Sequence, residues 1–193
     1  LGNMGSGMAD NLLKKNTDLV VFTRTKSKME NFTLKGAKSA ESVAELSSKC
    51  NIILTCLPDI NTSIKIFLGP DGIIDNASPG SVIVDHSTVD VATSKLIWEK
   101  ALNKNIYFID APISGGPLGA KDGSLTIMCG GDGIAFKIIE NILKKMGSLV
   151  VHMGGAGTGT SMKLVNQTLT AINTVASMEA MILADKCGID LKS

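Results

Sequence analysis

Two kinds of segment alternate along most of this chain, and the alternation constrains the fold more than any other feature. Short, nearly continuous apolar runs rich in β-branched residues indicate buried strands. They cover residues 18–23, 51–57, 81–85, 106–111, 125–129 and 149–152. Amphipathic helical stretches stand between them, at residues 6–15, 26–35, 42–50, 91–103 and 134–146. The pattern predicts an α/β domain over residues 1–155, with a mostly parallel sheet that helices cover on both faces.

Helix signals extend this prediction. Ser42 and Glu45 have the spacing of a capping box at the start of the third helical stretch. Residues 159–188 form one long helical stretch that is apolar nearly all round and ends near Gly188. Because such a helix must be covered, we expect residues 156–193 to be an interdomain helix that begins an all-α C-terminal domain. The cover would come from that domain or from a partner subunit, and we expect the full-length form to be a homo-oligomer.

The charge balance narrows the class of partner. The chain of 193 residues has 19 basic and 18 acidic residues, for a formal net charge of +1. This balance favours neither nucleic acid nor an anionic membrane as a partner. Aromatic residues make up only 4% of the chain, too few for the stacking platforms that bind single-stranded nucleic acid. Lysine, glutamate and amide residues interrupt the longest apolar stretch, at residues 162–184, so we expect no membrane span.

The cysteines indicate the compartment. The chain has four cysteines, none of them in a CxxC pair, and its two histidines do not stand at metal-ligand spacing from any cysteine. Cys56 and Cys129 lie in apolar runs and are expected to be buried thiols. We therefore expect no metal site and a reducing intracellular compartment. The cytoplasm is favoured, and the mitochondrion or a plastid stays open.

A glycine-rich segment opens the chain, and a helical stretch follows it at once. Leu1-Gly2-Asn3-Met4-Gly5 matches the second half of a GxGxxG dinucleotide-binding motif and lacks the first glycine. We expect the backbone at Gly2, Asn3 and Met4 to approach a pyrophosphate, with the helix N-terminus behind it. Gly5 would allow close packing of that helix. The alternative is an ordinary tight turn between a strand and a helix.

A basic run after the second strand position bears on the choice of cofactor. An acidic residue there typically binds the free ribose 2′-hydroxyl of NAD, but residues 23–28 read Thr-Arg-Thr-Lys-Ser-Lys. Arg24 can pair with a 2′-phosphate, and Thr25 and Lys28 can add hydrogen bonds. The run therefore favours NADP(H) over NAD(H). The alternative is a solvated basic turn.

The ends of later strands supply further candidates. Open α/β sheets bind ligands at the carboxyl ends of their strands. The candidates at the ends of two expected strands are Leu57, Pro58 and Thr62 after the first, and Thr88 after the second. They are candidate walls of a nicotinamide–ribose pocket, and ordinary strand-to-helix loops are an equal alternative.

Residues 110–124 form a long glycine-rich loop between two expected strands. Loops of this length in compact domains are usually functional or disordered. Ser114, Gly115 and Gly116 offer a hydroxyl and unhindered N–H groups that can hold a carboxylate.

Lys163 is the candidate proton donor. On a helical wheel it shares roughly 100° of arc with Asn166, Gln167, Thr170, Thr174 and Ser177, while the remaining circumference is mostly apolar. A polar stripe on an otherwise buried helix should line a polar cavity. A desolvated lysine there would have a lowered pKa suited to proton transfer. The alternative is a lysine whose side chain reaches solvent from the start of the helix.

These motifs, in this order, resemble the β-hydroxyacid dehydrogenases, which include 3-hydroxyisobutyrate dehydrogenase and the glyoxylate/succinic semialdehyde reductases. The resemblance rests on LGNMGSGMADNL at the start, DAPISGGPLGAKDGSL in the middle and GTGTSMKLVNQ at the start of the long helix. It implies a Rossmann-type domain whose first strand, like most of a C-terminal helical domain, lies outside this sequence. For that reason we expect residues 1–193 in isolation to fold poorly and to be weakly active.

The resemblance also implies roles. Lys163 would be the general acid or base, with Asn166 and Gln167 orienting it and the substrate oxygen. Ser114, Gly115 and Gly116 would bind the carboxylate of a small substrate. The cofactor would contact the candidate residues named above, from Gly2 to Thr88. Related 6-phosphogluconate dehydrogenases have histidine where Asn166 stands, which argues against a sugar-phosphate substrate. The alternative function is a non-catalytic NAD(P)-binding or interaction module on the same fold.

Overall fold

The expected strands pair into two sheets in the computed structural model, which describes residues 1–191. The larger sheet has the order β3-β4-β5-β7-β6, with β8 also paired to β7. Its strands are β3 (Ile52–Thr55), β4 (Val82–Asp85), β5 (Tyr107–Asp110), β6 (Ile113–Ser114), β7 (Leu125–Gly131) and β8 (Gly147–Gly154). The smaller sheet pairs β1 (Val20–Val21) with β2 (Lys38–Ser39). Most pairs are parallel, as expected, and β7 runs antiparallel to both β5 and β6.

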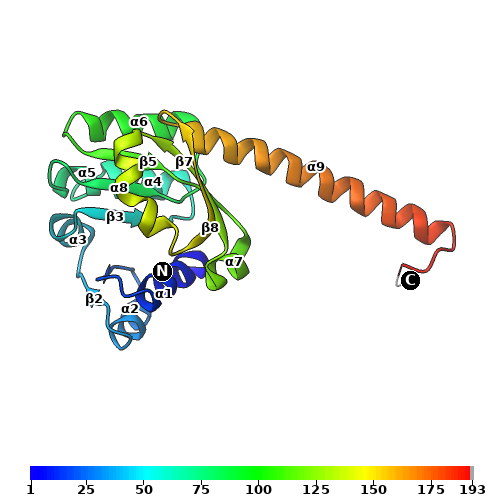
Figure 1. Cartoon of the computed structure of the whole chain (residues 1–193), viewed down its shortest axis with the longest axis horizontal. Coiled ribbons are helices and arrows are strands. Elements are labelled where there is room, and N and C mark those ends of the chain that lie inside the picture. Colours follow the sequence, from blue (N-terminus) through cyan, green and yellow to red (C-terminus); the bar gives the residue numbers. More distant parts are fainter. Residues whose placement is uncertain (192–193) are drawn as a thin grey trace.

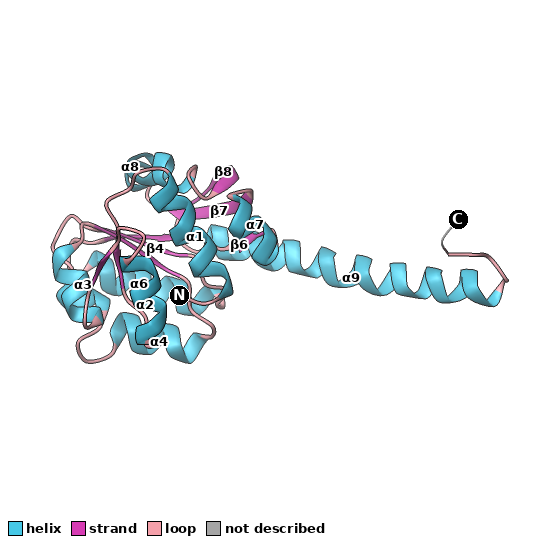
Figure 2. Cartoon of the chain, turned by 90° about the horizontal axis from the view of Figure 1, so that it is seen from below, coloured by secondary structure: helices cyan, strands magenta, loops and turns pink. Residues whose placement is uncertain are grey.

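Helices cover both faces of the larger sheet, which explains the continuous apolar strands (Figures 1 and 2). The helices are α1 (Asn3–Lys14), α2 (Lys26–Thr33), α3 (Val43–Lys49), α4 (Ile60–Leu68), α5 (Ile73–Asn76), α6 (Val91–Leu102), α7 (Gly116–Asp122), α8 (Gly133–Leu143) and α9 (Thr158–Lys186). Val82 and Val84 face a core that includes residues of α1 and α8. Ile83, between them, faces a second core formed with α4, α5 and α6. The α/β fold predicted from the alternation is confirmed.

The glycine-rich segment at residues 110–124 was predicted to be a loop. In the structure it contains a short strand, β6, and a helix, α7. Helix α7 starts at Gly116-Pro117, where proline suits the first turn, and ends at Gly123 in the left-handed conformation (φ 70°). It packs on α1, where Asn11 Nδ2 donates to the carbonyl oxygen of Ala120 at 2.8 Å. The segment is therefore ordered by its contact with the first helix.

Gly5 was predicted to allow close packing of the first helix, but among the described residues Gly7 has that role instead. A Cβ atom on Gly5 would meet nothing within 4 Å. A Cβ atom on Gly7 would lie 2.7 Å from the carbonyl carbon of Ala120, closer than side chains pack. Gly7 therefore allows α1 and α7 to approach.

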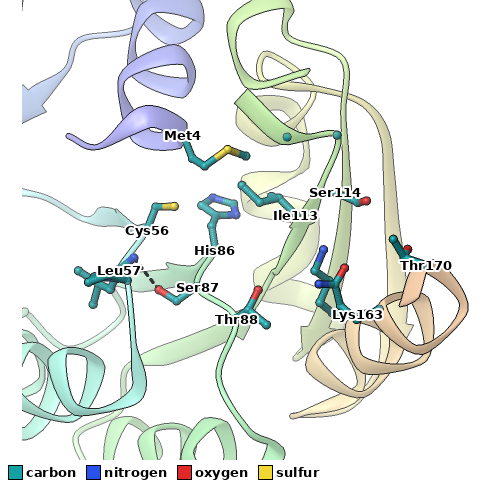
Figure 3. Close-up of a pocket in the computed structure, with 14 residues that line it drawn as sticks. Met4, Cys56, Leu57, His86, Ser87, Thr88, Ile113, Ser114, Lys163 and Thr170 are labelled. Atoms are coloured by element: carbon teal, nitrogen blue, oxygen red, sulfur yellow. Dashed lines mark hydrogen bonds between the residues drawn. The ribbon is translucent and has the colours of Figure 1, made fainter. Parts of the chain in front are cut away.

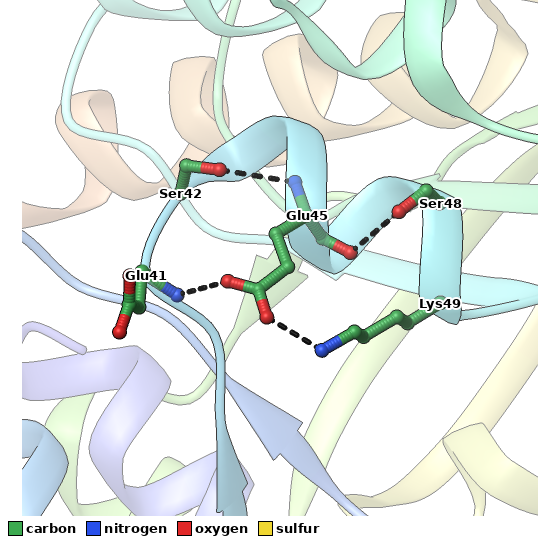
Figure 4. Close-up of polar contacts among 5 residues, drawn as sticks. All are labelled: Glu41, Ser42, Glu45, Ser48 and Lys49. Carbon is green, nitrogen blue, oxygen red and sulfur yellow. Dashed lines mark hydrogen bonds and ion pairs between the residues drawn. The ribbon is translucent and has the colours of Figure 1, made fainter.

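The capping box at Ser42 forms in a modified way (Figure 4). Ser42 Oγ accepts from the backbone N–H of Glu45 at 3.0 Å, as the motif requires. The Glu45 carboxylate accepts from the backbone N–H of Glu41, at 2.7 Å, rather than from that of Ser42. It also pairs with Lys49 one turn later. The helix start predicted from two residues is thus confirmed, with the reciprocal bond displaced by one residue.

Helix α9 leaves the sheet domain and extends away from it as a single rod (Figures 1 and 2). Its apolar residues beyond the first turns are exposed, among them Leu169, Ile172 and Val175. No helix among the described residues is long and apolar enough to cross a membrane. The first turns of α9, in contrast, pack on the ends of β5 and β7, and this end of the helix borders the candidate site.

Candidate active site

A cavity of about 440 Å³ opens at the carboxyl ends of β3 and β4 (Figure 3). Helix α1 contributes Met4 on one side, and α9 contributes Lys163 on the other. The cavity brings together Met4, Leu57, Pro58, Thr88, Ser114, Gly115, Gly116, Lys163 and Gln167, all of them expected from the sequence. Candidates from three distant motifs thus line one space.

Lys163 is the one charged side chain among the described residues that line this cavity. The residue is 8% exposed, and burial lowers the pKa of its ammonium group from the usual value. No carboxylate among the described residues is placed to restore that pKa by pairing with it. Gln167 and Thr170 follow on the same side of α9 at spacings of four and seven residues, as the helical period requires. Asn166 is half-buried and does not line the cavity.

Ser114 and the two glycines after it also line the cavity, and Ser114 lies on the same side of it as Lys163 (Figure 3). Gly115 and Gly116 both have positive φ, at 126° and 62°. L-residues with side chains rarely adopt this backbone, so glycine is required at both positions. The sharp turn ends β6 at Ser114 and starts α7 at once. A hydroxyl and backbone N–H groups therefore lie next to each other at the cavity.

A buried network fixes the wall formed by the ends of β3 and β4. Ser87 Oγ accepts from the backbone N–H of Leu57 at 2.8 Å and donates to Asp85 Oδ1 at 2.5 Å. The same carboxylate oxygen accepts from Thr55 Oγ1 at 2.7 Å. Burial raises the pKa of Asp85, and the hydrogen bonds from Ser87 and Thr55 oppose that rise. The network ties the two strand ends together and thereby sets the position of Leu57.

His86 forms part of the cavity floor and was not expected there. Its Nδ1 donates to the backbone carbonyl of Ala111 at 2.8 Å, because a carbonyl oxygen can only accept. Burial lowers the pKa of His86 to about 4, and the bond to Ala111 only partly opposes that change. The imidazole is therefore neutral at physiological pH. Its position directly after β4, at the carboxyl end of the strand, is the sequence signal from which it could have been predicted.

Apart from Met4, the candidate cofactor residues near the chain start lie outside this cavity. Gly2 is the N-cap of α1, and no side chain caps that helix, so its first N–H groups are available to a phosphate. The charges of Lys28 and Arg24 act at the backbone nitrogen of Leu1, so those two side chains lie close to the glycine-rich turn. Asn3 opens α1, and Thr25 is the exposed N-cap of α2.

This arrangement fits a dinucleotide. An uncapped helix N-terminus with basic side chains nearby suits a pyrophosphate and a further phosphate. Met4 belongs to the same helix end and also lines the cavity that holds Lys163. A ligand bound along this path would therefore run from the basic side chains to the lysine.

Thr62 does not belong to the cavity, and its predicted place as a wall residue is wrong. Its N–H and its hydroxyl both donate to the carboxylate of Asp59, at 2.7 and 2.9 Å. Asp59 is the N-cap of α4, a helix that the sequence pattern did not predict. The side chain of Thr62 is thus used to start that helix.

Comparison with known proteins identifies the family. The family profile described as the NAD binding domain of 6-phosphogluconate dehydrogenase matches residues 1–155. A second profile, described as NAD-binding of NADP-dependent 3-hydroxyisobutyrate dehydrogenase, matches residues 157–193. The chain belongs to the β-hydroxyacid dehydrogenase family. The predicted resemblance is confirmed.

Individual members of the β-hydroxyacid dehydrogenase family match the chain throughout. A Dictyostelium discoideum protein named probable mitochondrial 3-hydroxyisobutyrate dehydrogenase is 38% identical over 192 residues, which cover 100% of this chain and 60% of that protein. Mitochondrial 3-hydroxyisobutyrate dehydrogenase of Mus musculus is 37% identical and is covered over 57% of its length. The solved structure of Mycobacterium tuberculosis 3-hydroxyisobutyrate dehydrogenase with L-serine has a TM-score of 0.92 at 27% identity, covering 100% of this chain and 65% of that one. The chain thus spans about 60% of the length of these curated relatives.

Proposed function

We propose that the protein is an NADP(H)-dependent oxidoreductase that transfers hydride between nicotinamide and a small β-hydroxy acid, its semialdehyde, or glyoxylate. Lys163 is the general acid or base. The observation that carries the proposal is the desolvated lysine in a cavity that also contains Ser114 and reaches the end of α1 at Met4. The names of the curated relatives support an acid of this class.

In the proposed reduction the substrate carbonyl lies between Lys163 and Ser114. When bound, the nicotinamide supplies the hydride that the carbonyl carbon gains. The Lys163 ammonium donates a proton to the carbonyl oxygen, so the products are an alcohol and a neutral lysine amine. In the oxidation the neutral amine removes the hydroxyl proton. Because burial lowers the pKa of Lys163, its neutral amine is easier to reach than that of an exposed lysine.

The other cavity residues hold the substrate in this geometry. The Ser114 hydroxyl and the N–H groups of Gly115 and Gly116 donate to the substrate carboxylate. Gln167 in the cavity lining, together with its neighbour Asn166 outside that lining, orients the lysine and the reacting oxygen. Asparagine rather than histidine at position 166 supports a small acid over a sugar phosphate. The basic side chains near the glycine-rich turn support NADP(H) over NAD(H).

Replacing Lys163 with alanine tests the proposed role. We expect kcat of Lys163→Ala to fall by roughly 10² to 10⁴-fold, while the Kd for NADPH stays near that of the wild-type protein. Lys186→Ala, at the far end of the same helix, is the matched control and should keep full activity. Substantial turnover by Lys163→Ala would contradict the role. A protein that binds NADPH but reduces no carbonyl acid would instead be a binding module.

The exposed apolar length of α9 supports a proposal about assembly. Leu169, Ile172 and Val175 are each more than half exposed, and large exposed apolar patches typically mark interfaces. We propose that the protein is a homo-oligomer, with α9 covered in the assembly. Sedimentation over a range of concentrations tests this, and a monomer at every concentration would contradict it. The free thiols favour a reducing intracellular compartment, with the cytoplasm as the first expectation.

A further inference from the structure

Helix α9 lacks the local cap that several shorter helices have. Helices α3, α4, α6 and α8 each begin with an aspartate or serine whose side chain accepts from their first turn. Helix α9 begins at Gly157, which has a left-handed backbone (φ 83°) and no side chain to accept a hydrogen bond. The first N–H groups of a helix need acceptors, above all when they are buried. A partner from elsewhere in the fold must therefore supply them.

Asp110, the last residue of β5, supplies those acceptors. Its Oδ1 accepts from the N–H of Gly157 at 2.8 Å, and its Oδ2 accepts from the N–H of Thr160 at 2.7 Å. The residue is 2% exposed, so both bonds are shielded from water. A carboxylate at a helix N-terminus also has a favourable interaction with the helix dipole. One side chain from the sheet thus caps the longest helix of the chain.

Glycines allow this contact to be unusually close. A Cβ atom on Gly159 would overlap the carbonyl oxygens of Met128 and Asp110. A Cβ atom on Gly130 would lie 2.6 Å from Asp110 Oδ1 and from the backbone nitrogen of Gly159. The first turn of α9 therefore rests directly on the backbone of β5 and β7. Sliding or rotation of the helix by a fraction of a turn would break both hydrogen bonds.

Asp110 is linked to two segments that line the cavity. Along the chain, Ser114 follows it after four residues, through β6. Through its hydrogen bonds, Asp110 holds the turn of α9 that precedes Lys163 by three residues. The distance from the lysine to the substrate-binding loop is thus set through one carboxylate. Because proton transfer requires heavy atoms within hydrogen-bond distance, small changes in that spacing reduce the rate.

We propose that Asp110 is a positioning residue, which holds the N-terminus of α9 and thereby fixes the place of Lys163 in the cavity relative to Ser114. It does not contact the cavity itself and acts only through the helix. The catalytic part of this proposal rests on the proposed function. The anchoring of the helix does not.

The test compares Asp110→Asn with Asp132→Asn. Asp132 is the local N-cap of α8, since its Oδ1 accepts from the N–H groups of Ile134 and Ala135 at 2.8 and 3.0 Å, and α8 contributes no residue to the cavity lining. Asp110→Asn replaces one of two buried acceptor oxygens with a donor, whereas Asp132→Asn can keep the single acceptor that α8 uses, so Asp110→Asn should lose more stability. Only Asp110→Asn should lower kcat, by between about tenfold and 100-fold, with the Kd for NADPH within about twofold of wild type.

Amide hydrogen exchange supplies a readout that does not need activity. In Asp110→Asn the amide of Thr160 should exchange faster than in the wild-type protein, while the amides that open α8 are unchanged. Equal kcat values for the two variants, with fast exchange at Thr160 in Asp110→Asn only, would overturn the positioning role. Unchanged exchange at Thr160 would overturn the anchoring itself. A wild-type protein without turnover would overturn the proposed function and leave the exchange result to decide the anchoring.

Discussion

The side chains around the cavity owe their chemistry to burial. Lys163 and His86 both have a lowered pKa because water is excluded from them, and Asp85 and Asp110 have a raised pKa for the same reason. Of these four residues, only Lys163 and His86 line the cavity, and His86 is a neutral imidazole whose N–H is donated to Ala111. Lys163 is therefore a better candidate for the proton donor of this site than His86, Asp85 or Asp110.

The residues that line the cavity were easier to predict than those that support it. Lys163, Ser114 and Leu57 could be found because strand ends, glycine loops and helical periodicity predict where side chains gather. Asp110 and Ser87 could not, because their partners are backbone N–H groups that only the folded chain brings near. Thr62 was wrongly assigned because an aspartate three residues earlier competes for its polar groups, and α4 was not predicted.

The neutral state of His86 predicts a pH dependence of stability. Its pKa is about 4 in the folded chain, below the ordinary value of 6.5, so between these values the unfolded chain binds an extra proton. The contribution of neutral His86 to the free energy of unfolding is therefore fully present above pH 6.5, and it is lost as the pH falls toward 4. Between pH 7 and pH 5 the loss should be about 2 kcal/mol.

Urea unfolding of the wild-type protein and of His86→Met at pH 7 and at pH 5 measures this loss of stability. The variant should lose about 2 kcal/mol less than the wild-type protein on going from pH 7 to pH 5. Equal losses would mean that His86 titrates normally in the folded chain.

Arg24 is expected to decide between the two dinucleotides. Arg24→Asp removes a cation and adds an anion where the 2′-phosphate would bind, so the Kd for NADPH should rise at least tenfold more than the Kd for NADH. Fluorescence titration of both cofactors gives the two values. An equal loss for both would exclude a contact with the 2′-phosphate, and Lys26→Asp controls for the general loss of charge.

Among the elements, the long ones were predicted and the short ones were not. Six strands and six helical stretches were expected from apolar runs and periodicity, and each is present with ends displaced by a few residues. The elements that were missed are β2, β6, α4, α5 and α7, none of them longer than nine residues. In α7 the glycine-rich sequence indicates a loop, and packing on Gly7 of α1 overrides that propensity.

The cap of α3 allows a test at this scale. Ser42→Ala removes the acceptor for the Glu45 N–H and should reduce the free energy of unfolding by about 1 kcal/mol. Ser48→Ala, in the same helix, removes only an exposed hydrogen bond to the carbonyl oxygen of Glu45. This variant should change the free energy of unfolding by less than about 0.5 kcal/mol. Urea denaturation of both variants checks the difference. Equal effects would show that the side chain of Ser42 does not cap the helix.

In the whole molecule, the carboxyl ends of β3 and β4, the start of α1 and the start of α9 meet at one cavity. Family membership and this arrangement support the proposed chemistry, in which the sheet would hold a dinucleotide and Lys163 would donate a proton. We therefore propose hydride transfer to a carbonyl whose oxygen Lys163 protonates.

Isotope transfer tests that claim most directly. The protein is incubated with NADPH that carries deuterium on the transferable position of nicotinamide C4, together with glyoxylate or with succinic, tartronate or methylmalonate semialdehyde. Mass spectrometry of the products should find one deuterium on the former carbonyl carbon for at least one substrate, and none with Lys163→Ala under the same conditions. Tight binding of NADPH without deuterium in any product would contradict the account and identify the protein as a binding module.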